Sequence, residues 1–279
     1  MAKPMNPPAS QESTATPFQL HRVGVVMEPE PGNPLEAEGV LNPASARGRD
    51  GQLYLFPRLV SAGNYSRIGI ARVLFNEVGD PVGVERMGIA LEPVADYEMR
   101  PGGGGCEDPR ITFIEPLDRY VMTYTALSVR GPRIALAMSE DLFHWERLGL
   151  AIFMPYEGVD FNDVNNKDAA LFKKHPDMVR YRSPAPVLKP ELPGELEGVV
   201  PGVVFPTAID RRDDLGLPNR FDIYYGMADN RIGFARLDWE GDINSPIFQN
   251  SSGFPPSLGI YQATAEKASG GTVLKNSFI

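Results

Sequence analysis

The residues best suited to chemistry lie in one short segment, 102–110, which reads GGGGCEDPR. Its adjacent carboxylates, Glu107 and Asp108, can exchange a proton with a substrate, and Arg110 can bind an anion. Because glycine tolerates positive φ, the glycine run predicts a backbone that passes close to a ligand. Pro109 disfavours the helical region for the residue before it, so we expect a strand that starts extended at Asp108 and points its carboxylate inward.

A purely structural interpretation of this segment is also open. The glycine spacing matches neither a dinucleotide-binding fingerprint nor a P-loop. In this interpretation the glycines form a loop, and Glu107, Asp108 and Arg110 make ion pairs on the surface. Spacing alone does not separate the two.

Other polar residues recur at the starts, middles and ends of short apolar segments. They are Asn42, Arg58, Tyr124, Lys167, Asp168, Arg182 and Asp229. If these segments are strands around a common axis, the side chains converge there. Each residue also has a plain alternative, since Asn42 can cap a turn before Pro43 and Tyr124 can be a core residue.

The strands that would position these residues come from a repeat. Three segments share the pattern Arg-Ile-small-apolar-Ala and start at Arg67, Arg133 and Arg231. Each is preceded by an aromatic-rich β-type run and, before that, by a shorter apolar segment. The aromatic runs are 53–60, 120–127 and 221–228, and the shorter segments are 39–46, 109–115 and 202–209.

The repeat predicts an all-β fold, a β-propeller in which each unit is a blade with room for a fourth strand. A further half-unit is expected at 167–172 and 177–183, and a turn between third and fourth strands at 139–145. The alternative is a β-sandwich with chance similarity among the Arg-Ile pairs.

The composition agrees with many short strands and excludes several classes of function. The 279 residues include 28 Gly and 27 Pro, a high density of turn formers. A net charge of −9 argues against binding along a nucleic-acid backbone. One cysteine, Cys106, excludes an intrachain disulfide, and with three histidines a zinc site is not expected. No metal or other cofactor is predicted.

Three regions differ in composition. Residues 1–16 are interpreted as a flexible leader, 17–240 as the propeller domain, and 241–279 as an irregular C-terminal tail. No segment approaches the roughly 18 apolar residues that span a bilayer, and the N-terminus lacks a signal-peptide core. A cytoplasmic protein without a membrane partner is therefore expected.

Several motifs, in order along the chain, resemble one enzyme family. The segment GCEDPRITFIEPLDRYVMTYTA resembles the signature of the β-1,4-mannoside (mannooligosaccharide) phosphorylases, inverting enzymes built on a five-bladed β-propeller. The segments LNPASA, LYLFPRL, SRIGIA, NKDAALF, GVVPGVVFPTAI and IYYGMAD agree with it. The resemblance covers roughly residues 38–238.

The resemblance implies a reaction and a role for each matching residue. Such enzymes cleave a β-linked mannoside with inorganic phosphate to give α-mannose 1-phosphate, with Asp108 as general acid acting through the 3-hydroxyl of the sugar. Phosphate is already an anionic nucleophile, so the site needs cations rather than a second carboxylate. The implied phosphate ligands are Arg133, Lys167 and Arg182. The implied ligands of the mannosyl unit are Asn42, Arg58, Ser66, Arg67, Tyr124 and Asp229.

The chain departs from the family pattern in two places. Family members usually carry His-Arg-Pro where this chain has Tyr181, Arg182 and Ser183. Tyrosine is uncharged near neutral pH, so weaker phosphate binding is expected. Between Pro184 and Glu195 about one blade of the family's sequence is absent, which predicts four blades or an incomplete ring.

Three functions stay open on the sequence. The first is phosphorolysis of β-mannosides, and the second is their hydrolysis on the same fold, with Glu107 or another carboxylate as base. The third is a non-catalytic propeller that binds sugar. The expected partners are a β-mannoside oligosaccharide and inorganic phosphate, and a homo-oligomer is left open.

Overall fold

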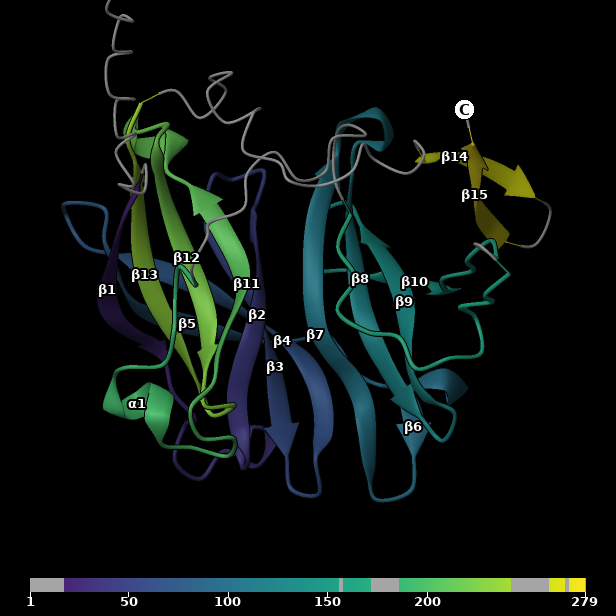
Figure 1. Cartoon of the computed structure of the whole chain (residues 1–279), viewed down its shortest axis with the longest axis horizontal. Helices are drawn as coiled ribbons and strands as arrows, with labels where there is room; N and C mark the ends of the chain where they lie inside the picture. The colour runs from purple at the N-terminus through teal and green to yellow at the C-terminus, as the bar shows by residue number, and fades with distance from the viewer. Residues whose placement is uncertain (1–17, 156–157, 172–185, 242–260, 269–270, 279) are drawn as a thin grey trace, which may run out of the picture.

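A computed structural model describes residues 18–155, 158–171 and 186–241, and the backbone of 261–268 and 271–278. Most strands in this part of the chain form three four-stranded antiparallel blades (Figure 1). The predicted all-β propeller is confirmed. The described residues give three blades whose sheets do not close into a ring, which agrees with the predicted incomplete ring.

Each blade is a meander of antiparallel strands. The first blade contains β2 (Gly39–Arg47), β3 (Leu53–Ser61), β4 (Tyr65–Phe75) and β5 (Pro81–Leu91). The second contains β7 (Gly103–Ile114), β8 (Arg119–Ser128), β9 (Gly131–Ser139) and β10 (Glu146–Leu150). The third contains β11 (Val204–Arg211), β12 (Arg220–Met227), β13 (Arg231–Trp239) and β1 (Phe18–Met27). The predicted turn at 139–145 lies between β9 and β10, as expected.

Short elements connect the blades. They are η1 (Pro34–Glu36), η2 (Asp96–Glu98), β6 (Met99–Arg100), η3 (Glu115–Leu117), α1 (Pro193–Leu196) and η4 (Asp213–Leu215). β6 pairs with the start of β7, and a short parallel pairing of β4 with β7 joins the first two blades into one nine-stranded sheet.

The fourth strand of the third blade comes from the beginning of the chain. β1 pairs antiparallel with β13, from Phe18 opposite Trp239 to Met27 opposite Ile232. The sequence repeat predicted a fourth strand after each unit. In the third blade the fourth strand is β1, which comes before the other two blades in the sequence, whereas β11 to β13 come after them. The pairing of β1 with β13 therefore joins the two ends of the described propeller.

The core lies between neighbouring blades. Along the second strand of a blade, successive side chains point to opposite faces of the sheet, so each face packs against the blade beside it. Tyr120, Met122 and Tyr124 of β8 point toward Phe56 and Ile68 of the first blade. A second cluster joins the first and third blades, where Leu53 and Leu55 of β3 meet Tyr224 and Phe234. Burial of these faces fixes how the three innermost strands, β2, β7 and β11, are arranged around the axis (Figure 1).

The glycine run serves the contact between blades. A Cβ on Gly105 would lie 2.0 Å from the carbonyl oxygen of Ser66 in β4, and one on Gly104 would lie 2.6 Å from that of Leu127 in β8. Both glycines have positive φ, 120° and 97°. At these two positions the close approach is to neighbouring strands, which by itself accounts for glycine there.

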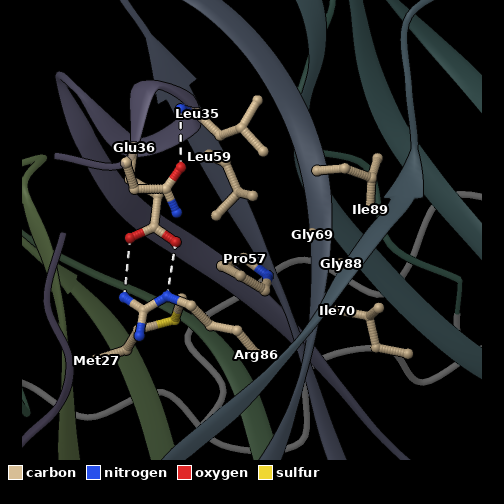
Figure 2. A pocket seen from close by; sticks show the side chains of 11 residues that line it. Met27, Leu35, Glu36, Pro57, Leu59, Gly69, Ile70, Arg86, Gly88 and Ile89 are labelled. Atoms are coloured by element: carbon tan, nitrogen blue, oxygen red, sulfur yellow. Dashed lines mark hydrogen bonds and ion pairs between the residues drawn. The ribbon is translucent and has the colours of Figure 1, made fainter. Parts of the chain in front are cut away.

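A buried glutamate and an arginine recur in every blade. Glu36, Glu98 and Glu195 lie on the short turns that precede the innermost strands and are 2%, 0% and 0% exposed. Each pairs at 2.8 Å with an arginine of the outermost strand of the same blade. These arginines are Arg86 on β5, Arg147 on β10 and Arg22 on β1. We call each pair a blade clamp, and Figure 2 shows Glu36 facing Arg86 in the first blade.

The predicted half-unit and the predicted C-terminal tail are described only in part. Residues 167–172 were expected to open a first strand, but 167–171, the part that the structure describes, form no strand, which corrects that prediction. The segment 177–183 lies outside the described residues. Within 241–279, for which an irregular tail was predicted, β14 (Tyr261–Ala268) and β15 (Gly271–Phe278) pair antiparallel.

Candidate active site

β-Bulges in the innermost strands position the two central side chains. In β2 the register shifts between Leu41 and Ala44, and in β7 it shifts between Glu107 and Arg110. The extra residues include Asn42 at φ 45° and Asp108 at φ 48°. The left-handed region is one that Asn and Asp tolerate better than other non-glycine residues, and it aims their side chains away from the strand's alternation.

The local geometry of Asp108 differs from the extended strand start that was predicted. Pro109 does keep Asp108 out of the right-handed helical region, but the residue adopts positive φ within β7. The strand has already begun at Gly103 because the glycines can pair there.

Asp108 is buried and held by polar partners from the first blade. It is 4% exposed. Asn42 donates a hydrogen bond from Nδ2 to Asp108 Oδ1 at 2.9 Å, and Arg58 NH1 lies 3.5 Å from the same oxygen. The structure thus brings Asn42 and Arg58 to Asp108, which lies 66 and 50 positions after them in the sequence.

Arg58 organises this part of the site. Its Nε donates to Ser66 Oγ at 2.9 Å, and its NH2 donates to Glu107 Oε1 at 2.8 Å and to Asn64 Oδ1 at 3.1 Å. One guanidinium therefore joins β3 and β4 of the first blade to both carboxylates of the second. Ser66, also predicted as a site residue, lies in the same network.

Glu107 is a buried carboxylate beside Asp108, not a surface ion-pair partner. Burial raises the pKa of Glu107, the positive charge of Arg58 opposes this, and the charge of Asp108 adds to it. The alternative in which 107, 108 and 110 form surface ion pairs is thereby excluded for Glu107 and Asp108, both of which are buried.

The segment 166–171 is held against the second blade by threonine side chains that the sequence analysis did not single out. Thr123 donates to the carbonyl of Ala169 at 2.6 Å, and Thr112 donates to that of Leu171 at 2.9 Å. The backbone N–H of Asp168 donates to Thr125 Oγ1 at 3.3 Å. The signal was available in β8, where Thr123 and Thr125 alternate with core aromatics.

Lys167 and Asp168 lie within electrostatic reach of the central carboxylates. Lys167 Nζ is 3.9 Å from Asp168 Oδ2 and its side chain is mostly exposed. Burial raises the pKa of Asp168, and the charge of Asp108 raises it further. The positive charge of Lys167 opposes the rise in pKa at both Asp168 and Glu107. Lys167 is therefore a cation with spare donors at the edge of the cluster.

Asp229 approaches from the third blade. It lies in the turn after β12 at φ 49°. Burial raises its pKa, Arg58 opposes the shift and Asp108 reinforces it, which places Asp229 in the same electrostatic cluster. The turn is docked on β2, because Val40 donates its backbone N–H to the carbonyl of Asn230 at 3.1 Å.

Arg110 faces the third blade rather than an acidic partner. Its NH1 donates to the carbonyls of Asp108 and Pro109 at 3.1 Å and 2.9 Å, and its guanidinium lies 5.7 Å from the ring centre of Phe205. Burial lowers its pKa, while Asp108 and Asp168 oppose that shift. Within the described residues it forms no ion pair with a carboxylate.

Three predicted ligands have other partners. Arg67 pairs with Glu92 at 2.7 Å and lies over the ring of Tyr65. Tyr124 is a core residue whose hydroxyl donates to Glu98 at 2.6 Å. Arg133 donates to the carbonyls of Asn162 and Asp163, both at 3.1 Å, and so holds the loop after β10. The structure does not connect these three side chains to Asp108.

The rest of the described surface offers no stronger site. Arg182 and Tyr181 lie outside the described residues. The pocket in Figure 2 is lined mainly by apolar residues, and its charged side chains, Glu36 and Arg86, are paired with each other. No group of three or more His, Cys, Asp or Glu in the described part of the chain could hold a metal ion. No helix there is long and apolar enough to cross a membrane.

Comparison with known proteins agrees with the fold and the motifs. At 28% identity the chain matches a 1,2-beta-oligomannan phosphorylase of Thermoanaerobacter sp. (strain X514), over 84% of this chain and 81% of the relative. A beta-1,2-mannobiose phosphorylase of the same organism is 40% identical over 30% of this chain and 27% of the relative.

Solved structures share the fold at low sequence identity. The beta-1,2-mannobiose phosphorylase of Listeria innocua superimposes with a TM-score of 0.57 at 16% identity, over 78% of this chain and 96% of that one. A putative glycoside hydrolase of Parabacteroides distasonis gives 0.58 at 19% identity, over 84% and 100%.

The family assignment rests on most of the described domain. The profile of the family described as beta-1,4-mannooligosaccharide phosphorylase matches residues 16–177 and 158–244. These ranges contain the three blades and the Asp108 cluster. The chain therefore belongs to this family of glycoside phosphorylases, glycoside hydrolase family 130.

Proposed function

We propose that this protein is a glycoside phosphorylase that cleaves β-linked mannosides with inorganic phosphate and inverts the anomeric carbon, giving α-mannose 1-phosphate. Asp108 is the general acid in this proposal. Its proton reaches the glycosidic oxygen through the 3-hydroxyl of the mannosyl unit, and phosphate attacks from the opposite face.

The observation that carries the proposal is the placement of Asp108. It is buried at a bulge in an inner strand, 2.9 Å from Asn42 and 3.5 Å from Arg58. Burial removes competing water and strengthens the electrostatic interactions of a proton donor. Residues from all three blades surround it, which supports a site built to hold one small polar ligand.

The charges around Asp108 support a sugar on one side and an anion on the other. Arg58 and Asp229 offer hydrogen-bonding groups for the mannosyl unit, and Ser66 orients Arg58 by accepting from its Nε. Lys167 is the best-placed described cation for phosphate because its side chain is exposed and no short ion pair occupies it. Arg182 completes the proposed phosphate site, and Arg133 contributes only if its loop contacts rearrange.

The linkage of the substrate is part of the test. The family is described by β-1,4-linked substrates, whereas the two relatives are named for β-1,2-linked ones. Purified protein is incubated with β-1,2- and β-1,4-mannobiose, with and without phosphate, and mannose 1-phosphate is measured. Its appearance only with phosphate is the expected result. Free mannose formed equally in both conditions contradicts phosphorolysis.

Hydrolysis is the second candidate, favoured by two observations. Arg133, an implied phosphate ligand, donates to loop carbonyls. Glu107 is a buried second carboxylate with a raised pKa, caused first by burial, next to Asp108. The same assay decides between the two reactions. If neither product forms while mannobiose still binds, the protein is a sugar-binding propeller.

A further inference from the structure

The Asn42 side chain is placed for a different task from the sugar contact that the family pattern implies. Asn42 is 4% exposed and lies against the third blade, where a Cβ on Gly226 would lie 2.2 Å from its Oδ1. The amide is thus wedged between β12 and Asp108.

The two halves of this amide have unequal partners. Nδ2 donates to Asp108 Oδ1 at 2.9 Å. Oδ1 is buried and has no hydrogen-bond partner among the described residues. A buried acceptor without a partner is costly, so the arrangement is expected to serve a purpose. Since nothing described holds Oδ1, only Asp108 determines which way the amide faces.

We propose that Asn42 is a positioning residue that acts through Asp108: its Nδ2 donates to Asp108 as the carboxylate, and its amide turns so that Oδ1 accepts a hydrogen bond from Asp108 when the carboxyl is protonated. A carboxylate oxygen can only accept, so it selects Nδ2. A protonated carboxyl donates, so it selects Oδ1 after a half-turn of the amide. One side chain thereby satisfies both states of the general acid. This inference rests on the proposed function of Asp108.

The backbone supports the assignment. Asn42 and Asp108 occupy corresponding bulges in adjacent inner strands, at φ 45° and 48°. Each is followed by proline, which keeps it out of the right-handed helical region. Both side chains therefore leave their strands in the same way and meet between the blades.

Other charges also act on Asp108 and must stay constant in a test. Arg58 comes from β3, Glu107 and Arg110 from β7, and Lys167 and Asp168 from the segment 166–171. Asp229 comes from the turn after β12. The test therefore changes Asn42 alone, with residues that tolerate positive φ.

The variants are Asn42→Gly, which removes the donor, and Asn42→Asp, which keeps the shape and replaces the donor by a carboxylate. Asp118→Gly is the matched control, since Asp118 also has φ 52° but lies on the exposed turn after η3. Asp108 is titrated by carboxyl NMR of protein labelled at aspartate, with Asp108→Asn assigning the signal. The pH profile of kcat/KM for mannobiose phosphorolysis is measured in parallel.

Loss of a donor to a carboxylate favours the protonated form. We expect the midpoint of the Asp108 signal, and the high-pH limb of kcat/KM, to move to higher pH by about one to two units in Asn42→Gly. Asn42→Asp moves both in the same direction, and Asp118→Gly moves neither.

Unchanged midpoints in both Asn42 variants overturn the inference. Weaker mannoside binding with an unchanged midpoint also overturns it, because Asn42 is then a sugar ligand. If wild type shows no turnover but the NMR midpoint shifts as expected, the inference holds and the proposed function fails. Should Asn42→Gly not fold, Asn42→Asp gives the same measurement with the original shape.

Discussion

The position of the Asp108 carboxylate depends on polar side chains that come from other strands. Its carboxylate meets an amide from β2 and a guanidinium from β3, and the same guanidinium holds Glu107. Two adjacent carboxylates that share one arginine have different surroundings. Asn42 donates to Asp108, whereas Ser66 lies beside Glu107, so substitution of each carboxylate tests its role separately.

Asp108→Asn removes the transferable proton while keeping shape and tolerance of positive φ. We expect kcat/KM for mannoside phosphorolysis to fall by about 10²- to 10⁴-fold with little change in melting temperature. Glu107→Gln serves as the comparison. A larger loss in Glu107→Gln than in Asp108→Asn would mean that the acid has been assigned to the wrong carboxylate.

Lys167 and Arg133 were both implied as phosphate ligands, but their surroundings predict different effects. Lys167→Met should raise KM for phosphate by about 10- to 100-fold and leave the fold intact, because its side chain is exposed. Arg133→Met should mainly lower the melting temperature, because Arg133 holds the loop carbonyls of Asn162 and Asp163. The reverse pattern in phosphate titrations and thermal melts would exchange the two roles.

The blade clamps explain why short turns stay docked on strands that lie far from them in the sequence. Glu98 accepts bonds from Arg147, Tyr124 and two backbone N–H groups, and Glu195 has the same set from Arg22, Tyr225 and its own turn. Each clamp holds in place the short turn that leads into an inner strand. The position of Asp108 at the bulge of β7 therefore depends on the clamp before it.

Arg147→Met should destabilise the protein by about 3 kcal/mol, because the completely buried Glu98 loses its counter-charge. Urea unfolding measures this. Arg211→Met is the control, since Arg211 and its partner Asp213 are both exposed and little loss is expected. Equal effects in the two variants would show that the clamp does not contribute to stability.

The clamps also predict a dependence on pH. Burial alone would raise the pKa of Glu98 and of Glu195, but the hydrogen bonds from the arginine, the tyrosine and two backbone N–H groups together outweigh it and leave both below the ordinary value of 4.5. Their stabilising contribution is therefore present above pH 4.5 and is lost as pH falls through the lower folded-state pKa. The stability difference between wild type and Glu98→Gln should shrink from about pH 6 to about pH 3. A constant difference would contradict the lowered pKa.

At the scale of the whole molecule, the three blades of the described residues surround the site, and β1 pairs with the last strand of the third blade. β1 supplies both the outer edge of the third blade and Arg22 of its clamp. Without β1, the edge of β13 is open and Glu195 loses its charge partner. Because Asp229 and Gly226 belong to that blade, the site would lose its third wall.

Deletion of residues 1–27 should lower the melting temperature by at least about 10 °C and broaden the transition. Deletion of 1–16, the proposed leader, is the control and should leave both unchanged. Differential scanning calorimetry of the two truncations checks this. A sharp transition at the wild-type temperature without β1 would show that the third blade does not need it.

The sequence by itself determined the repeat, the all-β class and the motif at Asp108. These depend on local patterns: alternation in β8, Arg-Ile at the start of third strands, and turn formers between them. The family resemblance implied Arg58, Ser66 and Asp229, and the structure places Arg58 and Ser66 in one hydrogen-bond network beside Asp108. What the sequence could not determine was which side chain meets which.

Only the tertiary structure decided that Tyr124 faces Glu98, that Arg133 holds a loop, and that Gly104 and Gly105 serve strand pairing. It also decided that β1 completes the third blade and that Asn42 contacts Asp108. These outcomes depend on blade packing and on bulges that reverse the alternation of an inner strand. Contacts between residues far apart in the chain leave no periodic trace in the sequence.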